Sequence, residues 1–182
     1  KLFQKRVRGL EYNISHYGSD FYIVTNKDKA TNFKVMKTPE TATSKENWKD
    51  LIPHNEKVLI EGIEIFKDYL VVEERTNGLN KIRIMPWSGN GEYYLPFEIE
   101  TYSAEVGTNV DFDTDVLRYG YQSLATPYSI IDFNMKTKTK EIKKEFEVLG
   151  GKFDKNNYIE ERVWATATDG TQVPISLVYR KE

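Results

Sequence analysis

Two histidines carry the side chains best suited to acid–base chemistry, because the sequence contains no cysteine. His16 follows a strand-like run and precedes the turn-like YGSD, and His54 follows Pro53 in LIPHNEK, a pattern typical of a loop. General-base catalysis requires a nucleophile and an orienting carboxylate within reach of the histidine, and no pattern places either group. No serine lies in a GxSxG nucleophile elbow. We therefore predict two exposed loop histidines, no catalytic residue and no zinc site.

Carboxylates gather in DFDTD, residues 111–115, where alternate aspartates suggest a calcium-binding loop. The rest of an EF-hand loop is missing. Val116 stands where glycine is required, and Gln122 stands where a bidentate glutamate closes the site. We therefore interpret Asp111 to Asp115 as an acidic connection between two strands, and we assign no metal site.

Two pairs of adjacent glutamates, Glu73-Glu74 and Glu160-Glu161, resemble the paired carboxylates of glycosidases. Adjacent residues of a strand point to opposite faces of the sheet, so neither pair can act on one substrate. We expect these side chains at solvated edges or in salt bridges.

The basic cluster KTKTKEIKKE, which begins at Lys136, suggests contact with a phosphate backbone, with Phe133 and Phe146 nearby. Acidic neighbours dilute its charge, and the aromatic residues are not interleaved as a stacking platform requires. Lysines on an outer strand prevent edge-to-edge association, which is our interpretation of Lys136 to Lys144. Nucleic-acid binding is a distant alternative, and we expect no nucleic-acid partner.

The composition indicates a globular chain of 182 residues with 39% hydrophobic and 13% aromatic residues. The 26 basic and 28 acidic residues leave no field that would attract nucleic acid or an anionic membrane. No window approaches the roughly 18 consecutive apolar residues of a membrane span, and the start shows no leader pattern. The lack of cysteine agrees with a cytoplasmic location. Both ends look cut from a longer protein, so we expect a fragment.

Strand-like runs recur at a nearly constant spacing along the chain. FYIVTN begins at Phe21, YLVVEER at Tyr69 and VLRYGYQS at Val116, which gives steps of 48 and 47 residues. Other strand candidates precede and follow these runs, at Tyr12 to His16, Glu61 to Phe66, Tyr102 to Val106, Lys81 to Met85 and Glu92 to Leu95. Units of about four strands with this period are typical of propeller blades.

The turn residues agree with this division. Asn77-Gly78 and Asp169-Gly170 suit two-residue hairpin turns that need positive φ, and SGNG at 88–91 gives the same freedom. A β-sandwich is the competing interpretation, but the regular period favours blades. We predict an all-β fold with about three four-stranded blades in residues 1–150. Residues 151–182 break the period and predict a hairpin that begins a second domain.

Four segments carry a more specific pattern: TNKDKATNFKV, LIPHNEKVLIEGIEIFKDYLVVEERTNGLNKIRI, LRYGYQSLATPYSIIDFNM and VWATATDGTQVPISLVYRK. In one order, from about Glu11 to Lys181, they closely resemble the prolyl oligopeptidase family of serine peptidases, and within it the oligopeptidase B (protease II) group. The resemblance implies a seven-bladed β-propeller joined to an α/β-hydrolase domain that bears a Ser, Asp and His triad. This chain resembles the final blades and the strands that lead into the hydrolase sheet.

The resemblance implies that the complete enzyme hydrolyses short peptides after Arg or Lys through a serine nucleophile, without a cofactor, while the propeller limits substrate size. The triad and the acidic residues that select basic side chains would lie beyond Glu182. We therefore assign no catalytic, cofactor-binding or metal-binding residue here, and the substrate-binding residues are unknown. The expected partners are short peptides and the missing catalytic domain. The alternative is an independent β-rich interaction module without a hydrolase partner.

Two structural expectations complete the prediction. Three blades of a closed ring leave two blade faces uncovered, so the chain should self-associate or be marginally stable. In LRYGY, Leu117, Tyr119 and Tyr121 share a face that packs between blades, while Gly120 permits close approach by a neighbouring sheet. Pro127 lacks a donor and belongs at the turn that follows.

Overall fold

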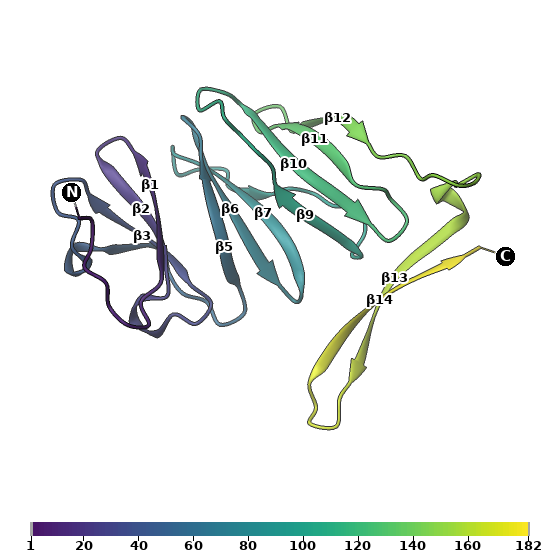
Figure 1. The fold of residues 1–182 in the computed structure, drawn as a ribbon, viewed down its shortest axis with the longest axis horizontal. Helices are drawn as coiled ribbons and strands as arrows, with labels where there is room; N and C mark the ends of the chain where they lie inside the picture. The colour runs from purple at the N-terminus through teal and green to yellow at the C-terminus, as the bar shows by residue number, and fades with distance from the viewer. Residues whose placement is uncertain (1, 182) are drawn as a thin grey trace.

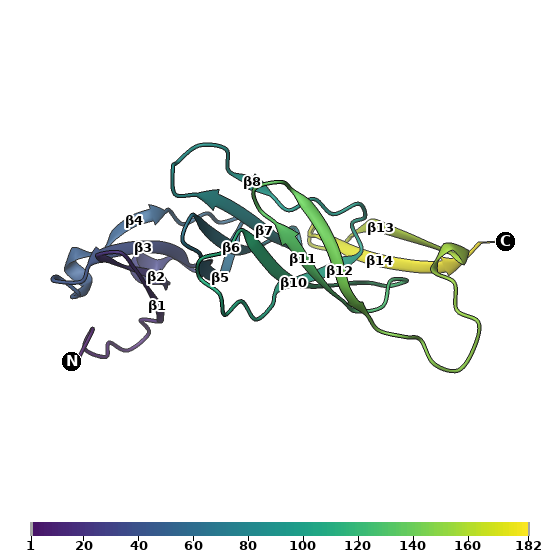
Figure 2. The ribbon, with the colours of Figure 1, turned by 90° about the horizontal axis from the view of Figure 1, so that it is seen from above.

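Three four-stranded sheets and one two-stranded hairpin follow one another along the long axis of the molecule (Figure 1 and Figure 2). The computed structural model describes residues 2–181, which form fourteen strands, three short 3-10 helices and no α-helix. Within this range no helix is long and apolar enough to cross a membrane.

Each four-stranded sheet is antiparallel, with its strands in sequence order, and we call the sheets blades 1, 2 and 3. Blade 1 contains β1 (Tyr12–Tyr17), β2 (Asp20–Thr25), β3 (Lys34–Pro39) and β4 (Lys49–Ile52). Blade 2 contains β5 (Leu59–Ile65), β6 (Tyr69–Thr76), β7 (Leu79–Pro86) and β8 (Tyr93–Tyr94). Blade 3 contains β9 (Tyr102–Val106), β10 (Val116–Ser123), β11 (Ser129–Asn134) and β12 (Thr139–Glu145). The hairpin contains β13 (Tyr158–Thr166) and β14 (Gln172–Arg180), and the connections contain η1 (Lys27–Lys29), η2 (Lys45–Asn47) and η3 (Lys155–Asn157).

The predicted internal period is confirmed. The three recurring runs are the second strands of the three blades, β2, β6 and β10. Blade 2 packs against blade 1 through one face and against blade 3 through the other (Figure 1), so the competing sandwich of two sheets is wrong. The strand predicted from Glu92 to Leu95 is shorter in the structure, where β8 contains Tyr93 and Tyr94, although Leu95 N–H still donates to the Ile82 carbonyl oxygen of β7 (2.8 Å).

Strand β6 shows how the sequence encodes this succession of sheets. Successive residues of a strand point to opposite faces. Tyr69 and Val71 belong to the core between blades 2 and 3, whereas Leu70 and Val72 belong to the core between blades 1 and 2. Burial of each Leu or Val side chain contributes about 1.5–3 kcal/mol. A strand in the middle blade is therefore apolar on both faces and appears in the sequence as the continuous run YLVV.

The turn predictions are confirmed in one case and wrong in another. Asn77 (φ 51°) and Gly78 (φ 74°) form the two-residue turn between β6 and β7. The loop between β13 and β14 instead has five residues, 167–171. Gly170 has positive φ (86°), but Asp169 does not, and a two-residue type I′ turn needs both. The Asp169 carboxylate accepts a hydrogen bond from Thr171 N–H (2.9 Å), which stabilises the longer loop.

The expectations for LRYGY are partly confirmed. Leu117 and Tyr119 are buried in the core between blades 2 and 3, and Tyr121 packs against it. Pro127 lies in the connection between β10 and β11. The prediction for Gly120 is wrong in one respect, because its close neighbour is Tyr128 of the same blade and not another sheet.

Replacing Gly120 by alanine is expected to destabilise the chain by about 1–3 kcal/mol. A β-carbon at this position would lie 2.3 Å from Tyr128 Oη, so the ring must move and lose its 3.2 Å hydrogen bond to Glu105 Oε1. Urea denaturation measures the change in unfolding free energy. In a Tyr128→Ala background the same substitution should cost nothing, whereas an equal cost in both backgrounds would exclude the clash as the cause.

Candidate functional site at the junction of the blades and the hairpin

The two histidines lie apart from any nucleophile. His16 is exposed in β1, with Nε2 3.3 Å from Glu40 Oε2. It therefore belongs to the strand predicted from Tyr12 to His16, and the prediction of a loop histidine is wrong. His54 lies in the connection between β4 and β5, as predicted, and its Nε2 accepts a hydrogen bond from Asn32 N–H (3.3 Å). Within residues 2–181 neither ring bonds to a serine hydroxyl, so the structure assembles no Ser–His pair here.

The acidic segment Asp111 to Asp115 lies between β9 and β10, as predicted. Asp113 pairs with Lys67 of blade 2 (Oδ2 to Nζ, 2.8 Å), and Asp111 Oδ1 accepts a hydrogen bond from Asp113 N–H (3.2 Å). In the described part of the chain, no group of three or more His, Asp or Glu side chains has the arrangement of a metal site.

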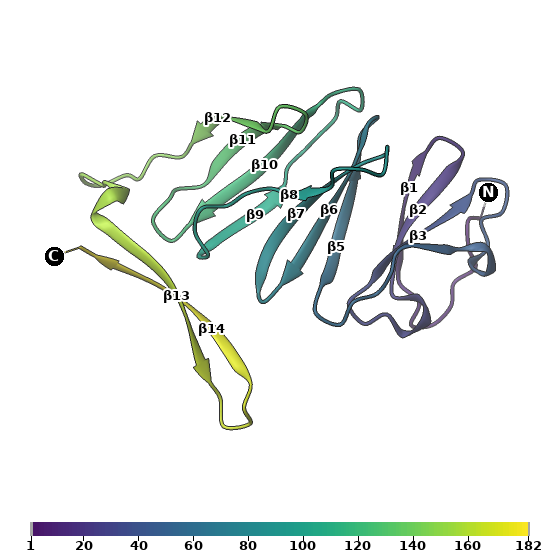
Figure 3. The same ribbon diagram turned by 180° about the vertical axis from the view of Figure 1, so that it is seen from behind.

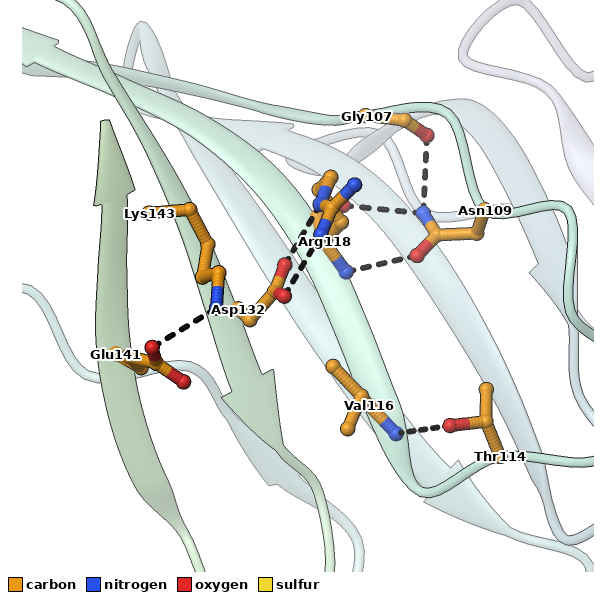
Figure 4. A network of polar contacts seen from close by, with 8 residues as sticks. All are labelled: Gly107, Asn109, Thr114, Val116, Arg118, Asp132, Glu141 and Lys143. Atoms are coloured by element: carbon orange, nitrogen blue, oxygen red, sulfur yellow. Dashed lines mark hydrogen bonds and ion pairs between the residues drawn. The ribbon is translucent and has the colours of Figure 1, made fainter. Parts of the chain in front are cut away.

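A polar network fixes the start of this connection to β10 (Figure 4). Asn109 Nδ2 donates to the carbonyl oxygens of Gly107 (2.9 Å) and Arg118 (3.0 Å), and Asn109 Oδ1 accepts from Arg118 N–H (2.7 Å). The Arg118 guanidinium donates twice to the Asp132 carboxylate, at 2.7 and 2.8 Å. These bonds lower the pKa of Asp132. The network holds the loop in place against β10 and β11.

The adjacent glutamates Glu73 and Glu74 point to opposite faces of β6, as predicted. The expected salt bridge forms at Glu74, and neither side chain lies at a solvated edge. Glu74 is almost fully buried and pairs with Arg83 (Oε1 to Nη2, 2.7 Å). Tyr94 Oη donates to Glu74 Oε2 (2.8 Å). On the other face, Glu73 Oε1 accepts a hydrogen bond from Val106 N–H of blade 3 (2.7 Å). The pair therefore stabilises blade 2 and its contact with blade 3.

Several carboxylates surround Glu73. Burial and the negative charges of Glu61 and Glu105 raise the pKa of Glu73, although the bond from Val106 N–H opposes this rise. Burial and the charge of Glu73 raise the pKa of Glu64 in β5. Folding therefore favours the protonated form of Glu73 relative to the unfolded chain.

The Glu73→Gln variant is expected to be more stable than the parent chain at neutral pH. Glutamine keeps an acceptor for Val106 N–H and removes a charge that other carboxylates repel. Because the pKa is raised in the folded state, the parent loses stability as the pH rises from the unfolded-state value of about 4.3 through the higher folded-state value. Thermal unfolding from about pH 4 to pH 8 should show the advantage shrinking on acidification. A difference that does not change with pH would contradict this explanation.

The lysine-rich segment forms an edge of blade 3. Strand β12 is exposed along its whole length and is the terminal strand of its sheet, as predicted, and it contains Lys140, Lys143 and Lys144. Lys136 and Lys138 lie instead in the turn before it. Lys143 Nζ pairs with Glu141 Oε1 (2.8 Å), and Lys138 Nζ lies 4.2 Å from the Tyr93 ring centroid. Neighbouring acidic and aromatic side chains thus contact these ammonium groups.

The hairpin is attached to blade 3 by one carboxylate, that of Glu160. Thr101 Oγ1 donates to Glu160 Oε1 (3.1 Å), and Ser123 Oγ donates to Glu160 Oε2 (2.9 Å). Thr101 is buried directly before β9, and Ser123 ends β10, where its Oγ also accepts from Thr126 N–H (2.9 Å). Both carboxylate oxygens are therefore bonded to residues held by blade 3.

Arg162, two residues further along the same face of β13, extends to blade 2. Its Nη2 donates to the Asn77 carbonyl oxygen in the turn between β6 and β7. Its guanidinium carbon lies 5.2 Å from the Trp164 ring centroid, within the range of a cation–π contact. A β-carbon on Gly78 would approach Arg162 Nη2 to 3.2 Å. Glycine at position 78 therefore allows both the positive φ of the turn and the close approach of the guanidinium.

The two faces of the hairpin differ in polarity. The face with Glu160 and Arg162 contacts the blades, and Glu161 points the other way and accepts a hydrogen bond from Tyr179 Oη (2.6 Å). That opposite face carries large apolar side chains that are 38–43% exposed: Val163, Val173, Ile175, Leu177 and Tyr179. Figure 3 shows the hairpin extending away from blade 3. The exposure of these side chains shows that no blade covers the apolar face.

A cavity of about 310 Å³ lies beside Glu160, between blade 3 and the start of the hairpin. Its aromatic lining includes Phe97 and Tyr121, whose rings are stacked 5.8 Å apart, and charged residues of both signs also line it. Burial, followed by the charges of Glu160 and Glu98, raises the pKa of Tyr121. Because Glu160 lines the cavity, its shape depends on how the hairpin docks.

A family model described as the prolyl oligopeptidase N-terminal β-propeller domain matches residues 1–146. The chain belongs to the prolyl oligopeptidase family. This membership agrees with the three blades and confirms the predicted partial β-propeller. The prolyl oligopeptidase family consists of serine peptidases, which are hydrolases, and the blades correspond to its propeller and not to its catalytic domain.

Individual members of the family match nearly the whole chain. Dipeptidyl aminopeptidase BI of Pseudoxanthomonas mexicana is 40% identical over 178 residues, which are 97% of this chain and 24% of that protein. Protease 2 of Moraxella lacunata is 29% identical and covers 98% of this chain and 25% of that protein. Oligopeptidase B from Leishmania major has a TM-score of 0.83 and 31% identity, and covers 96% of this chain and 25% of that structure. The chain thus spans about a quarter of the length of these relatives.

The residues that join the hairpin to blade 3 in this member of the prolyl oligopeptidase family were not predicted from the sequence. Thr101 and Ser123 are 59 and 37 residues from Glu160, and no local pattern links them. One signal was present in β13, where Glu160 and Arg162 share one face and the apolar Ile159 and Val163 share the other. Such alternation indicates that the two faces have different neighbours.

Proposed function

We propose that this chain is a non-catalytic part of a serine oligopeptidase that hydrolyses short peptides after Arg or Lys. The blades, residues 1–150, form part of the propeller lid that limits substrate size, and residues 151–182 are the first strands of the peptidase domain. The observation that carries the proposal is that the prolyl oligopeptidase propeller model matches residues 1–146. The hairpin that follows these residues pairs with none of the blade sheets. The apolar face of that hairpin is exposed here, as expected of a surface that the catalytic domain covers in the complete protein.

The preference for Arg or Lys is the one that the resemblance to the oligopeptidase B group implies. Two structures called oligopeptidase B, from Leishmania major and Trypanosoma brucei, are 31% and 32% identical to this chain, and the second holds covalently bound antipain. We extend the proposal to a cytoplasmic protein that needs no cofactor, in agreement with the lack of cysteine.

The experiment compares the purified 182-residue chain with the complete protein on a short fluorogenic peptide that contains arginine. The complete protein should release the fluorophore, and a serine-directed inhibitor should stop it. The chain alone should show no turnover, because within residues 2–181 no serine hydroxyl bonds to a histidine. Turnover by the chain alone would overturn the proposal.

A second candidate function is a dipeptidyl aminopeptidase, which the 40% identity to dipeptidyl aminopeptidase BI favours. Such an enzyme needs the free amino terminus of its substrate, whereas an oligopeptidase accepts a blocked one. Paired substrates with the same arginine and either a free or an acylated amino terminus separate the two activities. Cleavage of only the free form would favour the second candidate.

The alternative of an independent interaction module is decided by the coding sequence that follows Glu182, which either encodes GxSxG and a late histidine or does not. For the isolated chain, we propose self-association through exposed apolar side chains such as those of β13 and β14. Light scattering over a concentration series measures it, and a concentration-independent monomer would contradict it.

A further inference from the structure

Few polar contacts hold the hairpin to the blades. In the part of the chain that the structure describes, three hydrogen bonds join β13 or β14 to a blade or to the segment entering it. Two of them converge on Glu160, from Thr101 and Ser123, and the third joins Arg162 to Asn77. No backbone hydrogen bond joins this hairpin to a blade within residues 2–181.

The connection before the hairpin is tied to blade 3 by one long, exposed ion pair, Lys155 Nζ to Glu145 Oε2 (3.5 Å), and is otherwise open. Residues 146–157 are all exposed, and the segment contains Gly150 and Gly151. Gly150 has φ of 91°, and a β-carbon on either glycine would meet nothing within 4 Å. Glycines in open space give a connection little stiffness, so the angle of the hairpin depends on its side-chain contacts.

Glu160 is suited to set that angle. A carboxylate that accepts hydrogen bonds from two separate hydroxyls is held in direction as well as in distance, and bonds to a charged acceptor are stronger than neutral ones. Ser123 is itself fixed, because its N–H donates to the Thr126 carbonyl oxygen (3.0 Å) and its Oγ accepts from Thr126 N–H (2.9 Å). The receiving site is therefore preorganised by the corner between β10 and β11.

We propose that Glu160 is a positioning residue that locks the hairpin to blade 3, with Arg162 as a second point of attachment on blade 2. The inference rests on the proposed function, in which the hairpin begins the peptidase domain. The lock then holds that domain against the propeller and maintains the limit on substrate length. Loss of the lock widens access for longer peptides without changing the groups that perform the chemistry.

The first test uses the complete peptidase with Glu160→Ala and the control Glu56→Ala. The control removes the same side chain from an exposed position in the connection between β4 and β5, away from both faces of the hairpin. Each variant is assayed on a short arginine peptide and on a long peptide with the same cleavage site. Glu160→Ala should raise the long-to-short ratio of kcat/KM about fivefold or more, with kcat on the short peptide little changed, and Glu56→Ala should leave the ratio unchanged.

Two further variants separate positioning from general destabilisation. Glu160→Gln keeps hydrogen bonding to both hydroxyls and should restore most of the length limit. A Thr101→Val, Ser123→Ala double variant removes the two donors and should reproduce the effect of Glu160→Ala. Equal changes on short and long peptides in Glu160→Ala would overturn the proposal.

Hydrogen exchange on the same proteins distinguishes failure of the proposed lock from failure of the proposed function. Glu160→Ala should speed exchange in the linker 146–157 and in β13, whatever substrate the complete protein cleaves. Exchange identical to that of Glu56→Ala would exclude the lock. If no arginine or lysine peptide is cleaved but the exchange difference is present, the proposed specificity fails and the lock stands.

Discussion

Replacing Glu74 by alanine is expected to destabilise the chain by about 3–5 kcal/mol. The Glu74 side chain is 2% exposed, and that of Arg83, its partner across β6 and β7, is 16% exposed. Removal of the carboxylate leaves the guanidinium in a buried site without its counter-charge, and Tyr94 Oη loses its acceptor. Urea denaturation measures the loss of stability. Compared with the parent chain, hydrogen exchange should increase most in β8, because Tyr94 is one of the two residues of that strand.

The control is Glu56→Ala at an exposed position, which should change stability by less than about 0.5 kcal/mol. A second control replaces both partners. The double variant Glu74→Leu, Arg83→Met removes the buried charges together and should recover most of the loss, because apolar side chains of similar volume often replace a buried ion pair at no cost. If the double variant is as unstable as Glu74→Ala, the unpaired charge is not the cause.

The blades could be predicted from the sequence because their signals are local. Each blade repeats strands of alternating or continuous apolar character at a fixed distance, and turns such as Asn77-Gly78 need residues that tolerate positive φ. Strand β6 is apolar on both faces because it lies in the middle blade. These features depend on residues close together in the chain, so the order of sheets follows from them.

Most of the errors share a physical reason, which is that side-chain contacts between one strand and another leave no pattern in the sequence of either strand. The lack of a side chain at Gly120 correctly indicated that another group approaches closely. The residue type alone does not say whether that group belongs to a neighbouring sheet or is the Tyr128 side chain of the same blade. Glu74 is charged and yet buried, because Arg83 and Tyr94 satisfy its oxygens. The junction at Glu160 depends on two hydroxyls far away in sequence.

The second large effect is expected for Leu117→Ala, which should destabilise the chain by about 2–5 kcal/mol. Leu117 is fully buried in β10 and belongs to the core that blade 3 shares with blade 2, which includes Phe66, Val71 and Ile84. The truncated side chain leaves a cavity between the two sheets. Leu124, 50% exposed after the same strand, provides the matched control, and Leu124→Ala should have little effect.

This substitution also tests whether the blades are stable singly. Each blade buries its apolar faces against its neighbours, so its stability is the sum of its own strand pairing and the contacts with adjacent blades. A cavity at Leu117 should therefore speed hydrogen exchange in β6 and β7 as well as in β10 and β11. Blade 1 contacts blade 2 through a separate core that contains Val35, so β2 and β3 should be affected least. Faster exchange confined to blade 3 would contradict this coupling, because the two blades would then be stable without their shared core.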